Sequence, residues 1–122
     1  MSHAAVRLEQ APGLDIVTPS GDLDIFSAPR LRSVVFDPSS CSQALLVLDL
    51  SAIDFIDSTG LGVLVATRRW TRTRSAALVI VVKPGSVVAR VLALAGLDAV
   101  FTTVATRDDA VSSVDRGAPT SH

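Results

Sequence analysis

The sequence predicts an α/β fold: a mixed, mainly parallel sheet of about five short strands, with about four helices packed against it. Two continuous apolar runs, residues 44–48 and 78–82, are typical of central strands covered on both faces. Each run is followed by a segment with apolar residues at helical spacing. Near the N-terminus, two short strand patterns flank Pro12-Gly13, as in an antiparallel hairpin. The expected order is β-β-α-β-α-β-α-β-α, and right-handed crossovers make the sheet mainly parallel.

In the first half of the chain, the hairpin comprises residues 6–9 and 14–17, and residues 19–22 interrupt the sheet pattern. Ser27 is a suitable N-cap for a helix that ends before Asp37. The inward positions expected for this helix are Ala28, Leu31, Val34 and Val35. A Ser-rich loop follows, in which we expect Cys41 to be a loop thiol. The strand at 44–48 ends at Asp49, whose carboxylate we expect to bond nearby backbone.

A short irregular segment then leads to a second helix, which begins around Asp57 and ends near Arg72. Its inward stripe is expected at Leu61, Leu64, Val65 and Arg68. Its last turns carry a group of arginines that suits the negative end of the helix dipole and that we expect to form a solvated face: Arg68, Arg69, Arg72 and Arg74.

The strand at 78–82 leads to a third helix, which opens at residues 84–86 and is closed by Gly96 and Leu97. Its expected inward positions are Val87, Val88, Val91, Leu92 and Ala95. A last strand at 100–104 precedes a helix that Thr106 caps, with Ala110, Val111 and Val114 inward. The chain therefore reads as a single domain at 4–116 with a disordered tail at 117–122.

Composition excludes several classes of function. With 11 basic and 12 acidic residues the formal net charge is −1, which argues against a dedicated binder of nucleic acid or of an anionic membrane. No apolar run approaches the roughly 20 residues that span a bilayer, and the N-terminus has no signal-peptide core, so we expect a cytoplasmic protein.

Histidine occurs only at His3 and His122, and Cys41 is the one cysteine, so a His-based catalytic triad and a structural zinc site are both excluded. No Gly-x-x-x-x-Gly-Lys loop is present for nucleotide hydrolysis. We expect no catalytic residue, no metal site and no cofactor: the protein is better suited to be acted upon than to act as an enzyme.

The informative segment is residues 46–64, which delivers Ser58 to the start of a helix just beyond a central strand. The free N–H groups and the positive dipole end of a helix favour an anion there, so a phosphate on Ser58 is locally tolerated. The alternative is an ordinary capped helix. Gly60 and Gly62 each cost about 1 kcal/mol relative to Ala in the first turns. Close packing on the sheet or the close approach of a partner's backbone would offset that cost.

Other polar residues of this region carry weaker expectations. Asp57 either caps the helix or has a role in phosphorylation. In that role it would position the serine hydroxyl or the Mg-ATP that an outside kinase brings. Thr59 is a helix residue or, less favoured, a second acceptor of the phosphate. Asp22 and Asp24 look like a metal pair but lack further ligands, so a loop role or a partner contact is favoured.

The segment from Leu46 to Leu64 resembles the signature of the anti-sigma factor antagonists, the bacterial branch of the STAS domain family. In that family an Asp-Ser-Ser/Thr-Gly element carries the phosphorylated serine, and Ser58 matches it. Residues 21–24 are similar to the family's Gly-Glu-Leu/Ile-Asp box, with Asp22 where Glu is commoner. Residues 84–97 resemble its third helix. The match extends from about residue 14 to residue 104.

The resemblance implies an anti-anti-sigma factor. Its unphosphorylated form binds an anti-sigma factor, itself a serine kinase, and so releases the sigma factor. The kinase supplies ATP and Mg and phosphorylates Ser58, and a PP2C-type phosphatase restores the binding form; no direct contact with nucleic acid or membrane is implied. The expected partner-binding residues are Asp22, Asp24, Asp57, Ser58, Thr59, Gly60, Leu61 and Gly62. The alternative is a stand-alone STAS sensor or scaffold in which Ser58 only caps the helix.

Overall fold

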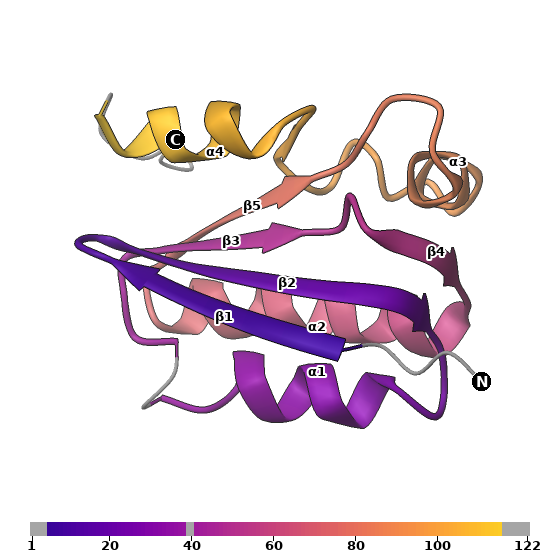
Figure 1. Cartoon of the computed structure of the whole chain (residues 1–122), viewed down its shortest axis with the longest axis horizontal. Coiled ribbons are helices and arrows are strands. Elements are labelled where there is room, and N and C mark those ends of the chain that lie inside the picture. The colour runs from indigo at the N-terminus through magenta and orange to yellow at the C-terminus, as the bar shows by residue number, and fades with distance from the viewer. Residues whose placement is uncertain (1–4, 39–40, 116–122) are drawn as a thin grey trace.

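The computed structural model describes residues 5–38 and 41–115 of the chain. In chain order these residues form β1 (Ala5–Ala11), β2 (Leu14–Leu23), α1 (Ala28–Val35), β3 (Leu45–Asp49), β4 (Ile53–Ile56), α2 (Ser58–Thr73), β5 (Ala77–Val81), α3 (Val87–Leu94), β6 (Thr103–Val104) and α4 (Arg107–Asp115). The sheet separates two helical layers, with α1 and α2 side by side on one face and α4 on the other (Figure 1). The predicted α/β class, with a mixed sheet, is therefore confirmed.

The strands lie in the order β1-β2-β3-β5-β6, and β4 pairs with the far end of β2. β1 and β2 form the predicted antiparallel hairpin, whereas the β2–β3, β3–β5 and β5–β6 pairs are parallel. β3 and β5 are the central strands that the two apolar runs predicted, each shifted by one residue. The sheet is thus mainly parallel, as expected.

The prediction that residues 19–22 interrupt the sheet is wrong, because β2 continues through them to Leu23. Its first part, Leu14 to Val17, pairs with β3, and its last part, Gly21 to Leu23, pairs with β4. Pro19 lies between these two stretches, where β1 alone lies beside β2, so a residue without an N–H is tolerated. The register shifts after Gly21, whose φ of 90° suits a bulge that turns the strand toward β4.

The segment predicted to be irregular between β3 and α2 contains β4. Its Phe55 and Ile56 pair in parallel with Asp22 and Leu23 of β2. Both central residues of the strand are exposed and both end residues are buried, so the alternation that reveals a strand in a sequence is missing. β4 matters because it ends directly before α2 and fixes where that helix begins.

The predicted strand at 100–104 is shorter, since β6 comprises Thr103 and Val104. The backbone N–H groups of Val100 and Phe101 both donate to the carbonyl of Leu97, at 3.0 and 3.3 Å, and so form a turn instead. The Phe101 side chain is buried in the core, which holds the chain in this turn.

Alternate residues of the central strands enter two separate cores. The larger core lies on the α1–α2 face, where Leu46, Leu48 and Ile80 meet side chains of α1, α2 and α3 such as Leu31 and Leu64. The smaller core lies on the opposite face and consists of Leu14, Ile16, Leu45, Val47, Val79, Val81 and Ala110. Ala110 is the residue of α4 that enters this smaller core.

The buried stripe of α2 differs from the predicted one. Of the predicted positions only Leu64 is buried, and the fully buried residues are Gly60, Val63, Leu64, Thr67 and Thr71. The hydroxyl of Thr67 donates to the carbonyl of Val63 at 2.7 Å, and that of Thr71 donates to the carbonyl of Arg68 at 2.9 Å. Because these hydroxyls are satisfied within the helix, threonine can lie on the buried face, which an apolar pattern cannot reveal.

The other helices mostly follow the sequence. The closure of α3 is confirmed, because the Leu97 N–H donates to the Leu92 carbonyl at 2.9 Å, but Ala95 is exposed, since it lies beyond the last helical residue. Thr106 accepts from the Asp109 N–H at 3.1 Å and caps α4 as predicted. Val111 is exposed rather than inward. The side chain of Val114 and the predicted tail at 117–122 lie outside what the structure describes.

Cys41, expected as a loop thiol, is fully buried in the larger core. Burial, together with the negative charge of Asp15, raises the pKa of its thiol to about 11. A neutral thiol of this kind behaves as a small apolar side chain.

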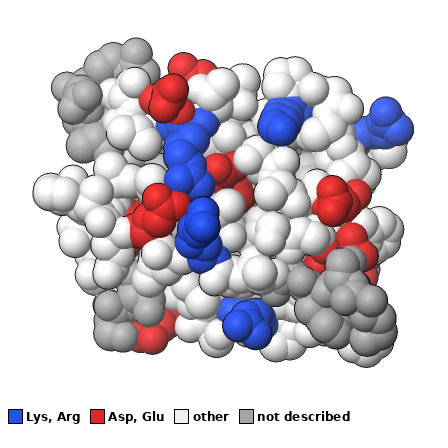
Figure 2. Space-filling view, in the orientation of Figure 1, with Lys and Arg blue, Asp and Glu red and all other residues white. Residues whose placement is uncertain are grey.

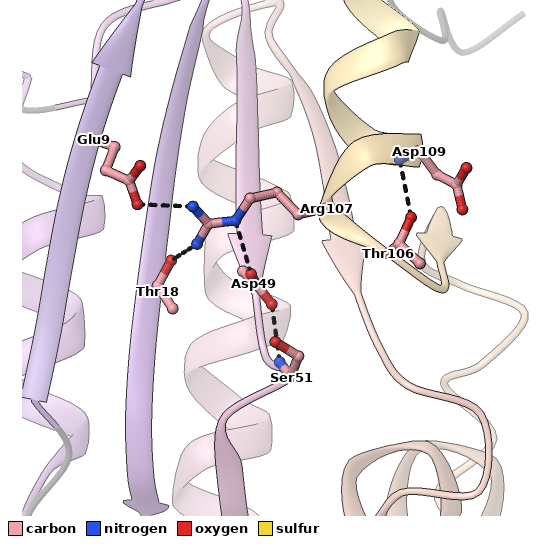
Figure 3. A network of polar contacts seen from close by, with 7 residues as sticks. All are labelled: Glu9, Thr18, Asp49, Ser51, Thr106, Arg107 and Asp109. Carbon is pink, nitrogen blue, oxygen red and sulfur yellow. Dashed lines mark hydrogen bonds and ion pairs between the residues drawn. The ribbon is translucent and has the colours of Figure 1, made fainter.

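A polar clasp fastens the start of α4 to three neighbouring strands (Figure 3). The Arg107 guanidinium donates to Glu9 of β1 at 2.8 Å, to the Thr18 hydroxyl of β2 at 2.7 Å and to Asp49 of β3 at 3.1 Å. The other carboxylate oxygen of Asp49 accepts from the Ser51 N–H at 3.0 Å, which confirms the predicted bond to nearby backbone. The ion pair with Arg107 is an addition that the sequence did not predict.

Basic and acidic side chains alternate closely on the face of the molecule shown in Figure 2, where a central column of Lys and Arg side chains is flanked by Asp and Glu. None of the helices within residues 5–38 and 41–115 is both long and apolar enough to cross a membrane.

Candidate functional site

The pairing of β2 with β4 brings two loops to one edge of the sheet. The Asp57 N–H donates to the carbonyl of Leu23 at 3.2 Å, directly after the last paired residues of the two strands. The segment after β2, residues 24–27, therefore lies beside the start of α2. These two segments contain most of the residues that the sequence predicted for a partner site.

Asp57 is the N-cap of α2, and its carboxylate accepts from the Gly60 N–H at 3.1 Å. The capping role, one of the two alternatives for this residue, is thus observed. Ser58 is the first helical residue and is exposed, as is Thr59. No hydrogen bond joins either hydroxyl to another residue in the described part of the chain. The Ser58 oxygen is accordingly open to solvent at the positive end of a helix of 16 residues.

The two glycines of the first turns have opposite surroundings. A Cβ on Gly60 would lie 2.7 Å from the Leu23 carbonyl oxygen and 2.8 Å from Cγ1 of Ile56, so this glycine lets α2 pack directly on the strand ends. A Cβ on Gly62 would meet nothing within 4 Å, and this residue is exposed. Close packing on the sheet explains Gly60, whereas no internal contact explains Gly62.

Asp24 organises the turn that follows β2. Its carboxylate accepts from the backbone N–H groups of Phe26 and Ser27 at 3.0 and 3.1 Å. The Ser27 hydroxyl donates to the Asp22 carbonyl at 2.6 Å and accepts from the Asp24 N–H at 3.0 Å. Ser27 therefore stands at the N-cap position of α1 but makes no capping bond, contrary to the prediction, because its side chain holds the turn instead.

Three large apolar side chains at this edge are exposed and were missed in the sequence. Ile25 and Phe26 in the turn are 62% and 78% exposed, and Phe55 of β4 is 48% exposed. The available signal was the pair Ile25-Phe26 within an otherwise polar turn. Exposed apolar residues grouped beside a helix start mark a surface suited to protein contact.

Two of the remaining residues predicted for partner binding, Gly60 and Leu61, face the protein interior at least in part. Leu61 is half-buried and packs against the larger core, and Gly60 is buried. Within residues 5–38 and 41–115, no three His, Cys, Asp or Glu side chains come together as metal ligands would. What the arrangement offers chemically is a free hydroxyl at a helix N-terminus, with exposed apolar side chains on the adjoining turn and strand.

Comparison with known proteins agrees with this geometry. A family model described as the STAS domain matches residues 5–110. Over 105 residues the chain is 32% identical to the anti-sigma-F factor antagonist RsfB of Mycobacterium tuberculosis. The aligned region covers 86% of this chain and 84% of RsfB. The chain therefore belongs to the STAS domain family.

Solved structures give the same result. The crystal structure of an anti-sigma factor antagonist from Mycobacterium paratuberculosis has a TM-score of 0.80 at 31% identity, covering 92% of this chain and 94% of that one. The unphosphorylated form of the anti-sigma factor antagonist SpoIIAA has a TM-score of 0.68 at 15% identity, covering 93% and 99%, and so shares the fold alone. The resemblance to anti-sigma factor antagonists that the motif around Ser58 indicated is confirmed.

Proposed function

We propose that this chain is an anti-anti-sigma factor, a regulatory protein of the cytoplasm rather than an enzyme. Its unphosphorylated form binds an anti-sigma factor and so releases the sigma factor. The anti-sigma factor is a serine kinase that phosphorylates Ser58 with its own ATP and Mg²⁺, and a PP2C-type phosphatase reverses the modification. The exposed Ser58 hydroxyl at the start of α2, beside exposed apolar side chains, carries this proposal.

The partner class is supported by the relatives. RsfB, at 32% identity, is named an anti-sigma-F factor antagonist, and the mycobacterial crystal structure at 31% identity is that of an anti-sigma factor antagonist. The docking surface that we assign comprises Ile25, Phe26 and Phe55 together with Ser58 and Gly62. Such a surface combines apolar area with an open helix start.

The phosphoryl step needs little from this chain. The Ser58 oxygen bonds to the γ-phosphorus of ATP, the bond from that phosphorus to the bridging oxygen breaks, and ADP leaves. The hydroxyl proton passes to a base of the kinase. The helix N-terminus then tolerates the new group, which adds about −1.5 to −2 charges at neutral pH, so the fold need not change.

The switch therefore acts on the interface. A charge that is removed from water without a partner costs several kcal/mol, and each 1.4 kcal/mol is a tenfold change in affinity. A phosphate among the exposed apolar side chains has this effect on a partner that covers them. We accordingly expect a local electrostatic and steric switch with little backbone change.

A pull-down from the native cell extract, with identification by mass spectrometry, tests the proposal. Wild-type protein should recover a kinase-like anti-sigma factor, and addition of ATP should release it. The Ser58→Ala variant should bind in the presence of ATP as well, whereas Ser58→Asp should bind about a hundredfold more weakly. Affinities are then measured with the purified partner.

Thr59→Ala is the matched control, because it removes a second exposed hydroxyl, from the next position. This variant should be phosphorylated and released like the wild type. Phosphate on Thr59, or equal affinity of the Ser58→Asp variant and the wild type, would contradict the assignment of Ser58. Recovery of the same partners regardless of the state of Ser58 would instead support the alternative, a STAS sensor or scaffold without a phospho-switch.

A further inference from the structure

We propose that the outward face of α2, near its C-terminal end, is a second binding site that receives a carboxylate-rich segment of a partner protein. The site is a hollow of about 380 Å³ lined by Val65, Arg68, Arg69, Arg72 and Thr73. This inference stands on its own residues and does not rest on the phosphorylation of Ser58.

The spacing of these residues places them on one side of the helix. They recur at three- and four-residue intervals, and the buried stripe of Gly60, Leu64 and Thr67 occupies the opposite side. Arg68 lies ten positions beyond Ser58, so the hollow is about 15 Å further along the helix axis. The two sites are thus separate surfaces of the same helix.

Within residues 5–38 and 41–115, the positive charge of the hollow is not neutralised by any ion pair. No ion pair or hydrogen bond joins the guanidinium groups of Arg68, Arg69 and Arg72 to any described residue, whereas Arg107 has two carboxylate partners. Neither α2 nor the adjacent α1 contains an acidic residue, although α1 contributes two more arginines. Five of the 11 basic residues of the chain therefore lie in α1 and α2, although the whole chain has a net charge of −1.

The lining points to carboxylates as the ligand. A guanidinium group presents a planar set of donors that pairs with a carboxylate through two parallel hydrogen bonds. Val65 provides an apolar wall for the methylene groups of a glutamate side chain. Pockets of roughly 300–1,000 Å³ accept small ligands, so this hollow holds a few side chains. Nucleic acid fits poorly, because it needs a long row of phosphate contacts and a large basic surplus.

Fluorescence anisotropy with a labelled oligoglutamate peptide and the full chain tests the site. We expect saturable binding that weakens as salt is added. The triple variant Arg68→Gln, Arg69→Gln, Arg72→Gln should bind about tenfold more weakly, since up to three exposed ion pairs are lost. The matched control removes three exposed cations elsewhere, with Arg7→Gln, Lys83→Gln and Arg90→Gln, and should stay within about twofold of the wild type.

The remaining outcomes separate the alternatives. Equal losses in the two triple variants would show bulk attraction and overturn the site, as would tighter binding of single-stranded DNA of matched charge. Loss of self-association in the Arg variant, measured by sedimentation, would make a second copy the occupant and also overturn the proposal. Ser58→Asp should leave oligoglutamate binding unchanged. A weaker affinity of this variant would show that the peptide binds at the N-terminal end of α2, and it would overturn the proposal.

Discussion

The two faces of the sheet are held by different forces. On one face, α1, α2 and α3 pack against the sheet through a large core of mainly apolar side chains. On the other, α4 contributes Ala110 to a small core and is fastened through Arg107, which reaches β1, β2 and β3. On the first face, we expect the free energy of unfolding to fall when buried side-chain volume is removed. On the second face, we expect it to fall when the guanidinium group of Arg107 is removed.

The difference bears on the support of the candidate functional site. Ser58 and Gly60 belong to α2, the helix on the strongly packed face, so the site rests on a rigid support. α4 lies on the face with fewer apolar contacts, and regions of this kind open locally at lower free energy than the rest of a domain. We therefore expect the two helices to respond differently to truncation of their anchoring side chains.

The largest effect is expected for Leu64→Ala in α2. Leu64 is fully buried in the larger core, and replacement of such a leucine by alanine costs about 2–5 kcal/mol through lost burial and the cavity that remains. Urea unfolding, followed by circular dichroism, should show one transition at a lower midpoint. A loss below about 1 kcal/mol would contradict the view that this face depends on tight packing.

Arg107→Ala should cost less, about 1–3 kcal/mol, because the guanidinium is partly exposed while its partner Asp49 is nearly buried. The carboxylate of Asp49 keeps its bond from the Ser51 N–H but loses its cation. Hydrogen exchange should rise first in α4, ahead of α2. Arg90→Ala, at an exposed arginine of α3, is the control and should change stability by less than about 0.5 kcal/mol. Uniform loss of protection in all helices would contradict a separate role for the clasp.

The sequence predicts what depends on local pattern. The Asp57 cap, the closure of α3 and the two apolar central strands each follow from a few neighbouring residues, and all are present. The clasp escaped prediction because Arg107 is 58 residues from Asp49 and 98 from Glu9. β4 was not predicted because it forms a strand only by pairing with residues 21–23 of β2, which follow Pro19.

The candidate site divides in the same way. Ser58 and Asp57 follow from a motif and a capping pattern, whereas the exposure of Phe26 and Phe55 depends on where β2 and β4 end in space. The close packing of Gly60 likewise depends on the Leu23 carbonyl, which is remote in sequence, whereas Gly62 faces open space. The surface around Ser58 thus depends on long-range geometry, whereas Ser58 itself is a candidate that the local sequence predicts.

Cys41 allows a test of the larger core by pH. Burial raises the thiol pKa from 9.0 to about 11, so the unfolded chain loses this proton first as the pH rises. The free energy of unfolding should therefore be undiminished below about pH 9 and fall as the pH rises toward 11. The chain has no tyrosine, so no phenol group contributes in this pH range.

The comparison with Cys41→Ala isolates this contribution. In the variant, the free energy of unfolding should no longer fall between about pH 9 and pH 11. At neutral pH the variant should be less stable than the wild type, because the buried sulfur is missing. Native protein should also react slowly with iodoacetamide at neutral pH, because the thiol is both buried and protonated. Rapid modification without unfolding would show that Cys41 is accessible and would contradict its place in the core.

The smallest effect is expected for Gly62→Ala, and its sign is the informative part. An added methyl group at Gly62 meets open space, so the change should stabilise α2 by about 0.5–1 kcal/mol through helix propensity alone. The same change at Gly60 should destabilise, because the Leu23 carbonyl oxygen at 2.7 Å belongs to the backbone and cannot move cheaply. Urea unfolding of both variants gives the two signs. If Gly62→Ala stabilises the chain yet weakens binding of the proposed anti-sigma partner, the glycine is retained for the approach of that partner. Unchanged binding would remove Gly62 from the proposed docking surface.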